Sequence, residues 1–172
     1  MNNPIDTMLH EHGVISQAAD IVETLNGTWE DDADGYAEKA TKLIAFFREY
    51  ADEYHHRKEE DVLFPALKDH PDFVLEEMVD EFEQHHEDFR EYAADAESAL
   101  EDGDHAASYK HLKAYVSDLL DHIAAENDEI FVLAENLLSE NDLETIYFRF
   151  EDIDRDLGYD RKAELEKQVQ EM

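Results

Sequence analysis

The sequence contains no cysteine, and this absence removes several classes of site. Disulfides, thiolate zinc sites, cysteine-ligated iron–sulfur clusters and cysteine nucleophiles are all excluded. Glycine and proline are scarce, with five and three residues among 172, so each one is expected to mark a helix end or a turn. No apolar run approaches the roughly 20 residues needed to span a bilayer, and no signal peptide is apparent. We therefore expect a soluble, cytoplasmic protein with no membrane partner.

Basic residues are also few, and this shortage narrows the range of partners. Lys and Arg total 14 against 47 Asp and Glu, which gives a formal net charge of −33. Nucleic acids and anionic membranes would be repelled by this charge, so neither is expected as a partner. The acids are spread along the chain, as on an ordinary solvated helical surface. We favour the more specific interpretation that the protein is halophilic, and that high salt screens the repulsion among its acidic side chains.

Strand alternation is lacking, and helical periodicity extends through most of the chain. Four segments with short links predict an all-α protein, an up-down-up-down four-helix bundle over residues 1–140. The expected helices cover about 5–25, 36–67, 70–100 and 105–138, with the third starting at His70-Pro71. Residues 141–172 are predicted to form a helical extension broken near Gly158. Its apolar face would pack on the bundle or on a second copy of the chain, giving a homodimer.

The helical period sorts the histidines into inward and outward groups. Each of the four predicted bundle helices places one histidine on its apolar stripe: His12, His55, His86 and His122. Three neighbours, His10, His56 and His85, fall instead on polar faces. On the third helix His85 is the alternative to His86, and we favour His86 because it shares a face with Phe82 and Phe89.

Two of the inward histidines are followed one helical turn later by a glutamate, at His55/Glu59 and His122/Glu126. The spacing puts both side chains on one face, about 6 Å apart along the axis. Such pairs are common in so acidic a chain, and His56/Glu60 is a third. Burial is more informative, because an ionised carboxylate on an apolar stripe is costly unless it is paired or bound to a metal. The alternative is that these glutamates reach water or pair with imidazolium.

An internal repeat strengthens the metal interpretation. The segments HHRKEEDVLF and HIAAENDEIF align without a gap, with nine residues from His55 to Phe64 and from His122 to Phe131. The chain therefore consists of two helical hairpins of the same plan. Together they predict a pseudo-symmetric site of four imidazoles and two carboxylates in a bundle core, where dinuclear carboxylate sites are built.

The donor types narrow the choice of metal. Nitrogen and oxygen ligands without sulfur suit iron or manganese, and zinc remains an alternative. Four histidines are too few to saturate two octahedral ions, so open positions would remain for water, O2, peroxide or nitric oxide. Iron is the expected cofactor.

Four motifs, LHEH, HHRKEEDVLFPAL, QHHEDF and HIAAENDEIF, resemble those of the hemerythrin-like, HHE cation-binding family over about residues 5–138. The resemblance implies a non-haem di-iron centre, oxo-bridged and with both carboxylates usually bridging the irons. Carried over by position, its ligands are His12, His55, Glu59, His86, His122 and Glu126.

The sequence departs from the oxygen-carrying hemerythrins at two ligand positions. Phe82 and Arg90 flank His86 at four residues, so a His-x-x-x-His pair is missing, and Asn127 stands where those proteins have an aspartate. The chain thus looks closer to the four-histidine, two-glutamate branch. That branch is similar to proteins that sense iron or oxygen and to proteins that repair nitrosylated iron centres.

The leading functional prediction is a di-iron protein that binds or senses O2, nitric oxide or iron. The alternative is an oxidoreductase or iron-centre repair protein that handles peroxide or nitric oxide. A third possibility is a metal-free interaction bundle with merely packed histidines.

Overall fold

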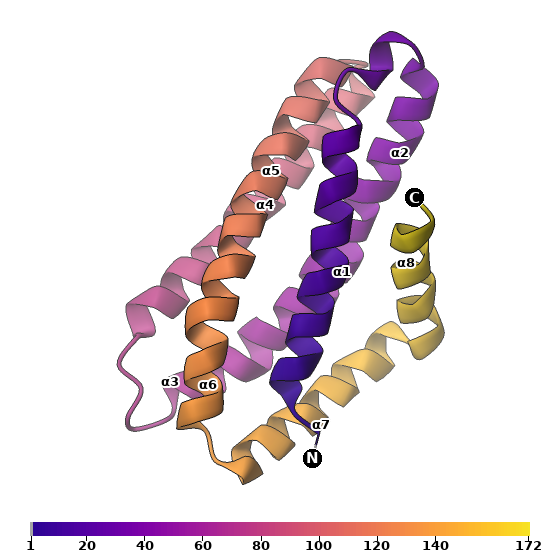
Figure 1. Ribbon diagram of the computed structural model, residues 1–172. Coiled ribbons are helices and arrows are strands. Elements are labelled where there is room, and N and C mark those ends of the chain that lie inside the picture. Colours follow the sequence, from indigo (N-terminus) through magenta and orange to yellow (C-terminus); the bar gives the residue numbers. More distant parts are fainter. Residues whose placement is uncertain (1) are drawn as a thin grey trace.

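Four long helical segments lie side by side in the computed structural model, which describes residues 2–172 (Figure 1). The described residues contain helices and no strand, so the predicted all-α bundle with extra C-terminal helices is confirmed. The first segment is α1 (Pro4–Thr24), and the third is α4 (Glu76–Glu101). The second runs through α2 (Ala33–Phe46), η2 (Phe47–His56), η3 (Glu59–Leu63) and α3 (Phe64–Lys68). The fourth runs through α5 (His105–Ala125), η4 (Glu126–Ile130) and α6 (Phe131–Leu137).

The helix ends follow local signals in the sequence. Asn3 caps α1 by accepting a hydrogen bond from the Ile5 amide at 2.9 Å, and Asp104 caps α5 in the same way. Gly27 and Gly103 have φ values of 75°, in the left-handed region that glycine adopts without strain. A short 3-10 turn, η1 (Thr28–Glu30), links α1 to α2.

One predicted boundary is wrong, because the third helix starts at Glu76 and not at His70-Pro71. Residues 69–75 form turns, in which the Phe73 amide donates to the His70 carbonyl at 3.1 Å. Phe73 is buried, and the connection carries its ring into the core before the helix begins. The burial of this one aromatic residue therefore prevails over the helix-start signal of the proline.

Three parts of the bundle have π-helical turns, in which the backbone bond spans five residues and not four. The Phe64 amide bonds to the Glu59 carbonyl, and the Phe131 amide bonds to the Glu126 carbonyl, which closes equivalent wide turns in the two hairpins. A longer stretch, η2, ends at His55 and His56. A wide turn brings consecutive side chains closer together around the helix axis, so it changes which residues face inward.

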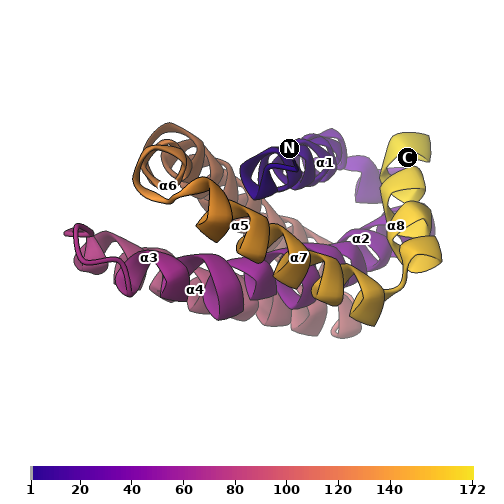
Figure 2. The ribbon, with the colours of Figure 1, turned by 90° about the horizontal axis from the view of Figure 1, so that it is seen from below.

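Two more helices follow the bundle. In Figures 1 and 2, α7 (Glu140–Leu157) crosses the bundle near the N-terminus, and α8 (Tyr159–Glu171) turns back and packs against α1. Ile146, Phe150 and Ile153 are buried at the interface, as the apolar spacing predicts. The homodimer and the division of the chain at residue 140 stay predictions. No helix among residues 2–172 is long and apolar enough to cross a membrane.

A proline in the bundle helps to attach α7. Pro65 has no amide hydrogen, so the carbonyl of Asp61, four residues earlier, lacks its usual helical partner. The Arg149 guanidinium of α7 donates to this carbonyl at 3.1 Å. A gap in the helical hydrogen bonding thus becomes a contact between the bundle and the extension.

We expect Phe150→Ala to destabilise the metal-free protein by about 3–5 kcal/mol, because the substitution empties a fully buried site between α7 and the bundle. Phe148→Ala, on the same helix but 57% exposed, should change stability by less than about 0.5 kcal/mol. Urea unfolding of both variants followed by circular dichroism measures the difference. Equal midpoints would show that α7 is not part of the cooperative fold.

Candidate metal centre

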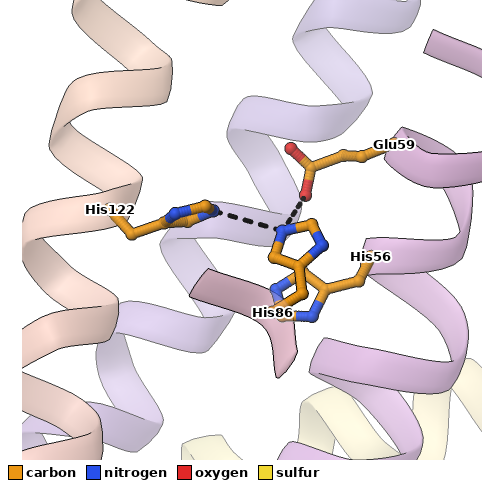
Figure 3. A group of neighbouring side chains, drawn as sticks. All are labelled: His56, Glu59, His86 and His122. Carbon is orange, nitrogen blue, oxygen red and sulfur yellow. Dashed lines mark hydrogen bonds and ion pairs between the residues drawn. The ribbon is translucent and has the colours of Figure 1, made fainter. Parts of the chain in front are cut away.

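The structure brings together the side chains of all six predicted ligands. Two groups of ligand atoms form, and the atoms of each group lie within 4.8 Å of one another. One group is His12, His55, Glu59 and Glu126; the other is His56, Glu59, His86 and His122, which Figure 3 shows. Glu59 belongs to both groups, so the two form one continuous site. All seven residues are buried, with at most 2% of their surface exposed.

Six inner atoms of this site have no hydrogen-bond partner, whereas Nε2 of His86 and Nε2 of His122 contact each other at 3.3 Å. Among the described residues, the buried side-chain atoms without one are Nε2 of His12 and His55 and all four carboxylate oxygens of Glu59 and Glu126. Nε2 of His122 approaches Oε1 of Glu126 to 2.9 Å without forming a hydrogen bond. Buried polar atoms are nearly always paired, and buried carboxylates are paired or bound to metals. These convergent unpaired nitrogens and oxygens are the arrangement that a metal cation would satisfy.

The outer nitrogen of every histidine in the site is hydrogen-bonded to a second side chain. The Nδ1 contacts are His12 with Asn127 Oδ1 at 2.6 Å, His55 with Glu11 Oε1 at 3.0 Å, His56 with Asp52 Oδ1 at 3.1 Å, His86 with Glu60 Oε1 at 3.1 Å, and His122 with His85 Nδ1 at 3.0 Å. In four of these the partner is an oxygen that can only accept, so the histidine carries its proton on Nδ1. Its Nε2 is then a bare lone pair directed into the site, as metal-ligating histidines require.

Burial lowers the pKa values of four of these imidazoles, those of His55, His56, His86 and His122, and so favours the neutral form, which is the form that binds metals. Burial lowers the pKa of His56 to about 4 and that of His86 to about 3, in spite of carboxylates beside both rings. Burial likewise raises the pKa of Glu126. A cation in the site would favour the ionised carboxylate and remove the cost of burying it.

Arg90 holds two of the outer carboxylates. Its guanidinium donates to both oxygens of Asp52 at 2.8–3.0 Å and to both oxygens of Glu60 at 3.2 Å. Burial alone would raise the pKa of Asp52, but hydrogen bonds from His56 and Arg90 lower it to about 2. Arg90 thus fixes the carboxylates that orient His56 and His86.

The prediction that His56 faces water is wrong. His56 is 1% exposed, and its ring stacks on that of His86 with 3.8 Å between the centroids. The prediction assumed α-helical spacing, whereas His55 and His56 end the π-helical stretch η2, where two consecutive side chains can both face inward. The site therefore contains five imidazoles and not four.

The other histidine assignments on these helices hold. His86 is fully buried, whereas His85 is half-buried and reaches the site only through Nδ1 of His122. The His10 side chain is 58% exposed. Sequence reasoning missed Glu11 and Lys58, which are both fully buried beside His55. Glu11 lies next to His12 in the motif LHEH, and nothing in the motif other than this position indicated that Glu11 would be buried.

The repeat seen in the sequence is present in three dimensions. Phe64 and Phe131 each lie nine residues beyond a ligand histidine, and both are buried. Each ring packs against a ligand histidine of the other helical hairpin. Phe131 stacks on His12 with a centroid distance of 5.1 Å, and Phe64 stacks on His86 at 6.2 Å. Each aromatic ring limits the orientations of the histidine that it covers.

Comparison with known proteins agrees with this geometry. The model of the Hemerythrin HHE cation binding domain matches residues 3–134, which contain every residue of the site. No curated protein and no solved structure gives a significant match. The match spans most of the chain and coincides with a buried His/Glu cluster suited to a metal cation. The chain therefore belongs to the hemerythrin HHE cation-binding family.

Proposed function

We propose that this protein holds two iron ions in the bundle and binds or senses a small molecule there. The observation that carries the proposal is the set of six unpaired inner atoms: Nε2 of His12 and His55, whose Nδ1 atoms are already bonded, and the four carboxylate oxygens of Glu59 and Glu126. His12, His55 and Glu126 would hold one ion, and His56, His86 and His122 the other. Glu59 belongs to both groups of ligand atoms and would bridge them.

Iron is proposed because the donors are imidazole and carboxylate, without sulfur. Manganese and zinc accept the same donors, and the affinity order does not favour iron, so supply in the cell would contribute to the choice. When bound, iron would supply reversible coordination of O2 or nitric oxide. The chain's residues would hold the ions, keep the imidazoles neutral and exclude bulk water.

The burial of the site favours a small ligand. The seven side chains of the site are at most 2% exposed, and a surface cleft of about 350 Å³ touches the site at His122. His85, Phe89 and Asp121 are among the residues that line this cleft. A diatomic gas, peroxide or a free metal ion could reach such buried atoms with little displacement of side chains, whereas a large organic substrate could not. Binding or sensing is proposed ahead of an oxidoreductase or iron-centre repair reaction, because such a reaction would also need an electron donor.

Protein purified without added metal should contain about two iron ions per chain, as dinuclear bundle sites do. Glu59→Ala should reduce the content to below about one, because this carboxylate serves both groups of ligand atoms. Asp61→Ala, two residues away and exposed, is the control and should keep the wild-type content. Elemental analysis with the absorption spectrum before and after air exposure measures both. Zinc or no metal in the wild type would refute the iron proposal.

The fifth histidine gives a separate prediction. His56→Ala should lower the metal content from about two ions to about one, because the group with His86 and His122 loses a donor while the His12 group stays intact. His10→Ala removes an exposed histidine from α1 and should leave the content unchanged. Two metals retained in His56→Ala at wild-type affinity would limit the ligands to the six residues predicted from sequence.

A further inference from the structure

A second buried polar cluster lies directly beside the proposed metal ligands. It consists of Glu11 on α1, Tyr54 and Lys58 on the second bundle segment, and Asp154 on α7. Lys58 and Glu11 are fully buried, Tyr54 is 1% exposed, and Asp154 is 5% exposed. Asp154 lies outside the segment that matches the family, residues 3–134. The cluster therefore connects the C-terminal extension to the interior of the bundle.

The hydrogen bonds of this cluster are complete. The Lys58 ammonium lies 2.6 Å from Glu11 Oε2, 2.7 Å from the Tyr54 hydroxyl and 2.8 Å from Asp154 Oδ1, so each of its three N–H groups has an acceptor. The Tyr54 hydroxyl in turn donates to Asp154. The ammonium also lies 4.1 Å from the centroid of the Tyr54 ring. A fully satisfied buried network of this kind is rigid, because any displacement leaves a charged group unpaired.

Glu11 links the network to the metal site. Its Oε2 accepts from Lys58, and its Oε1 accepts from Nδ1 of His55 at 3.0 Å. The carboxylate cannot donate, so the His55 proton stays on Nδ1 and Nε2 is left bare. This Nε2 is one of the unpaired atoms of the site and lies 3.4 Å from Glu59 Oε1.

We propose that Glu11 is a positioning residue for His55, and that the C-terminal extension holds Glu11 in place through Asp154 and Lys58. The extension would then be part of the metal site, although it supplies no ligand. The inference rests on the proposed metal-binding function and adds to it. It predicts that changes on α7 alter metal affinity at a distance.

The substitution Glu11→Gln gives the proposal a specific test, because the hydrogen-bonding groups of an amide differ from those of a carboxylate. A glutamine has one acceptor oxygen, and the Lys58 ammonium, which needs an acceptor, would take it. The amide N–H2 would then face Nδ1 of His55 and donate to it. Nδ1 could accept only if the ring proton moved to Nε2, the atom that must be bare to bind a metal. Glu11→Gln should therefore reverse the tautomer of His55 with almost no change in volume.

The first experiment uses the metal-free full-length protein, so it does not depend on the proposed function. Nitrogen-15 NMR of the histidine rings should show the proton of His55 on Nδ1 in the wild type and on Nε2 in Glu11→Gln. Asp154→Ala should shift the His55 signals, and Asp154→Asn, which keeps the acceptor oxygen, should restore them. Asp152→Ala is the matched control, because Asp152 is exposed on the same helix and forms an ion pair with Arg155, outside the network.

The second experiment titrates the same proteins with Co²⁺, whose visible absorption reports its ligands. Glu11→Gln should weaken one of the two Co²⁺ sites by about 10–100-fold, as the loss of an outer partner typically does. Asp154→Ala should weaken the same site by a smaller factor, and Asp152→Ala should match the wild type. The site with His86 and His122 should keep its affinity.

The two experiments separate the two proposals. No Co²⁺ binding by the wild type would refute the metal-binding function, and the NMR result would still decide the role of Glu11. A wild-type His55 with its proton on Nε2 would overturn the positioning role. Wild-type ring signals and Co²⁺ affinity in Asp154→Ala would overturn the role of the extension. Circular dichroism checks the fold of each variant. If Glu11→Gln does not fold, the same measurements on Asp154→Ala, at the edge of the network, still test the proposal.

Discussion

The burial of two carboxylates without hydrogen bonds is the constraint on which the rest of this structure depends. Glu59 and Glu126 are fully enclosed, and none of their four oxygens has a partner. An isolated charge in such a place costs several kcal/mol even after relaxation. The surrounding imidazoles do not offset this cost, because burial lowers the pKa values of His55, His56, His86 and His122 and so favours their neutral form. Carboxylate oxygens and imidazole lone pairs converging on one space repel one another unless a cation lies between them.

The sequence was sufficient to predict the bundle and the gathering of six side chains, because both depend on periodicity and charge burial. His55 and His122 lie on apolar stripes with a glutamate one turn later, and the structure places both pairs inside. His56 could not be found in this way, since the argument assumed α-helical turns. The π-helical stretch that turns His56 inward is stabilised by tertiary contacts, including its stacking on His86, which no local pattern encodes.

Buried charged residues outside the ligand set were missed for a related reason. In a chain with 47 acids, one more glutamate in LHEH or one lysine in HHRKEE is most simply read as solvated. Lys58 is buried because three acceptors meet it, one from α1, one from its own helix and one from α7. Acceptors from three separate segments meet at one ammonium group only in the assembled fold, so the sequence alone does not reveal them. The start of the third helix was misplaced similarly, because the burial of Phe73 is a tertiary effect.

The two halves of the site differ in how far the outer partners of their histidines are exposed. Around His55 the outer shell is the closed network of Glu11 and Lys58, which α7 covers. Around His56, His86 and His122 the outer partners are Asp52, Glu60 and His85, all partly exposed. Asp52 and His85 also line surface clefts. The extension thus covers the His55 side of the site, and the cleft that touches His122 lies on the other side, between α4 and α5.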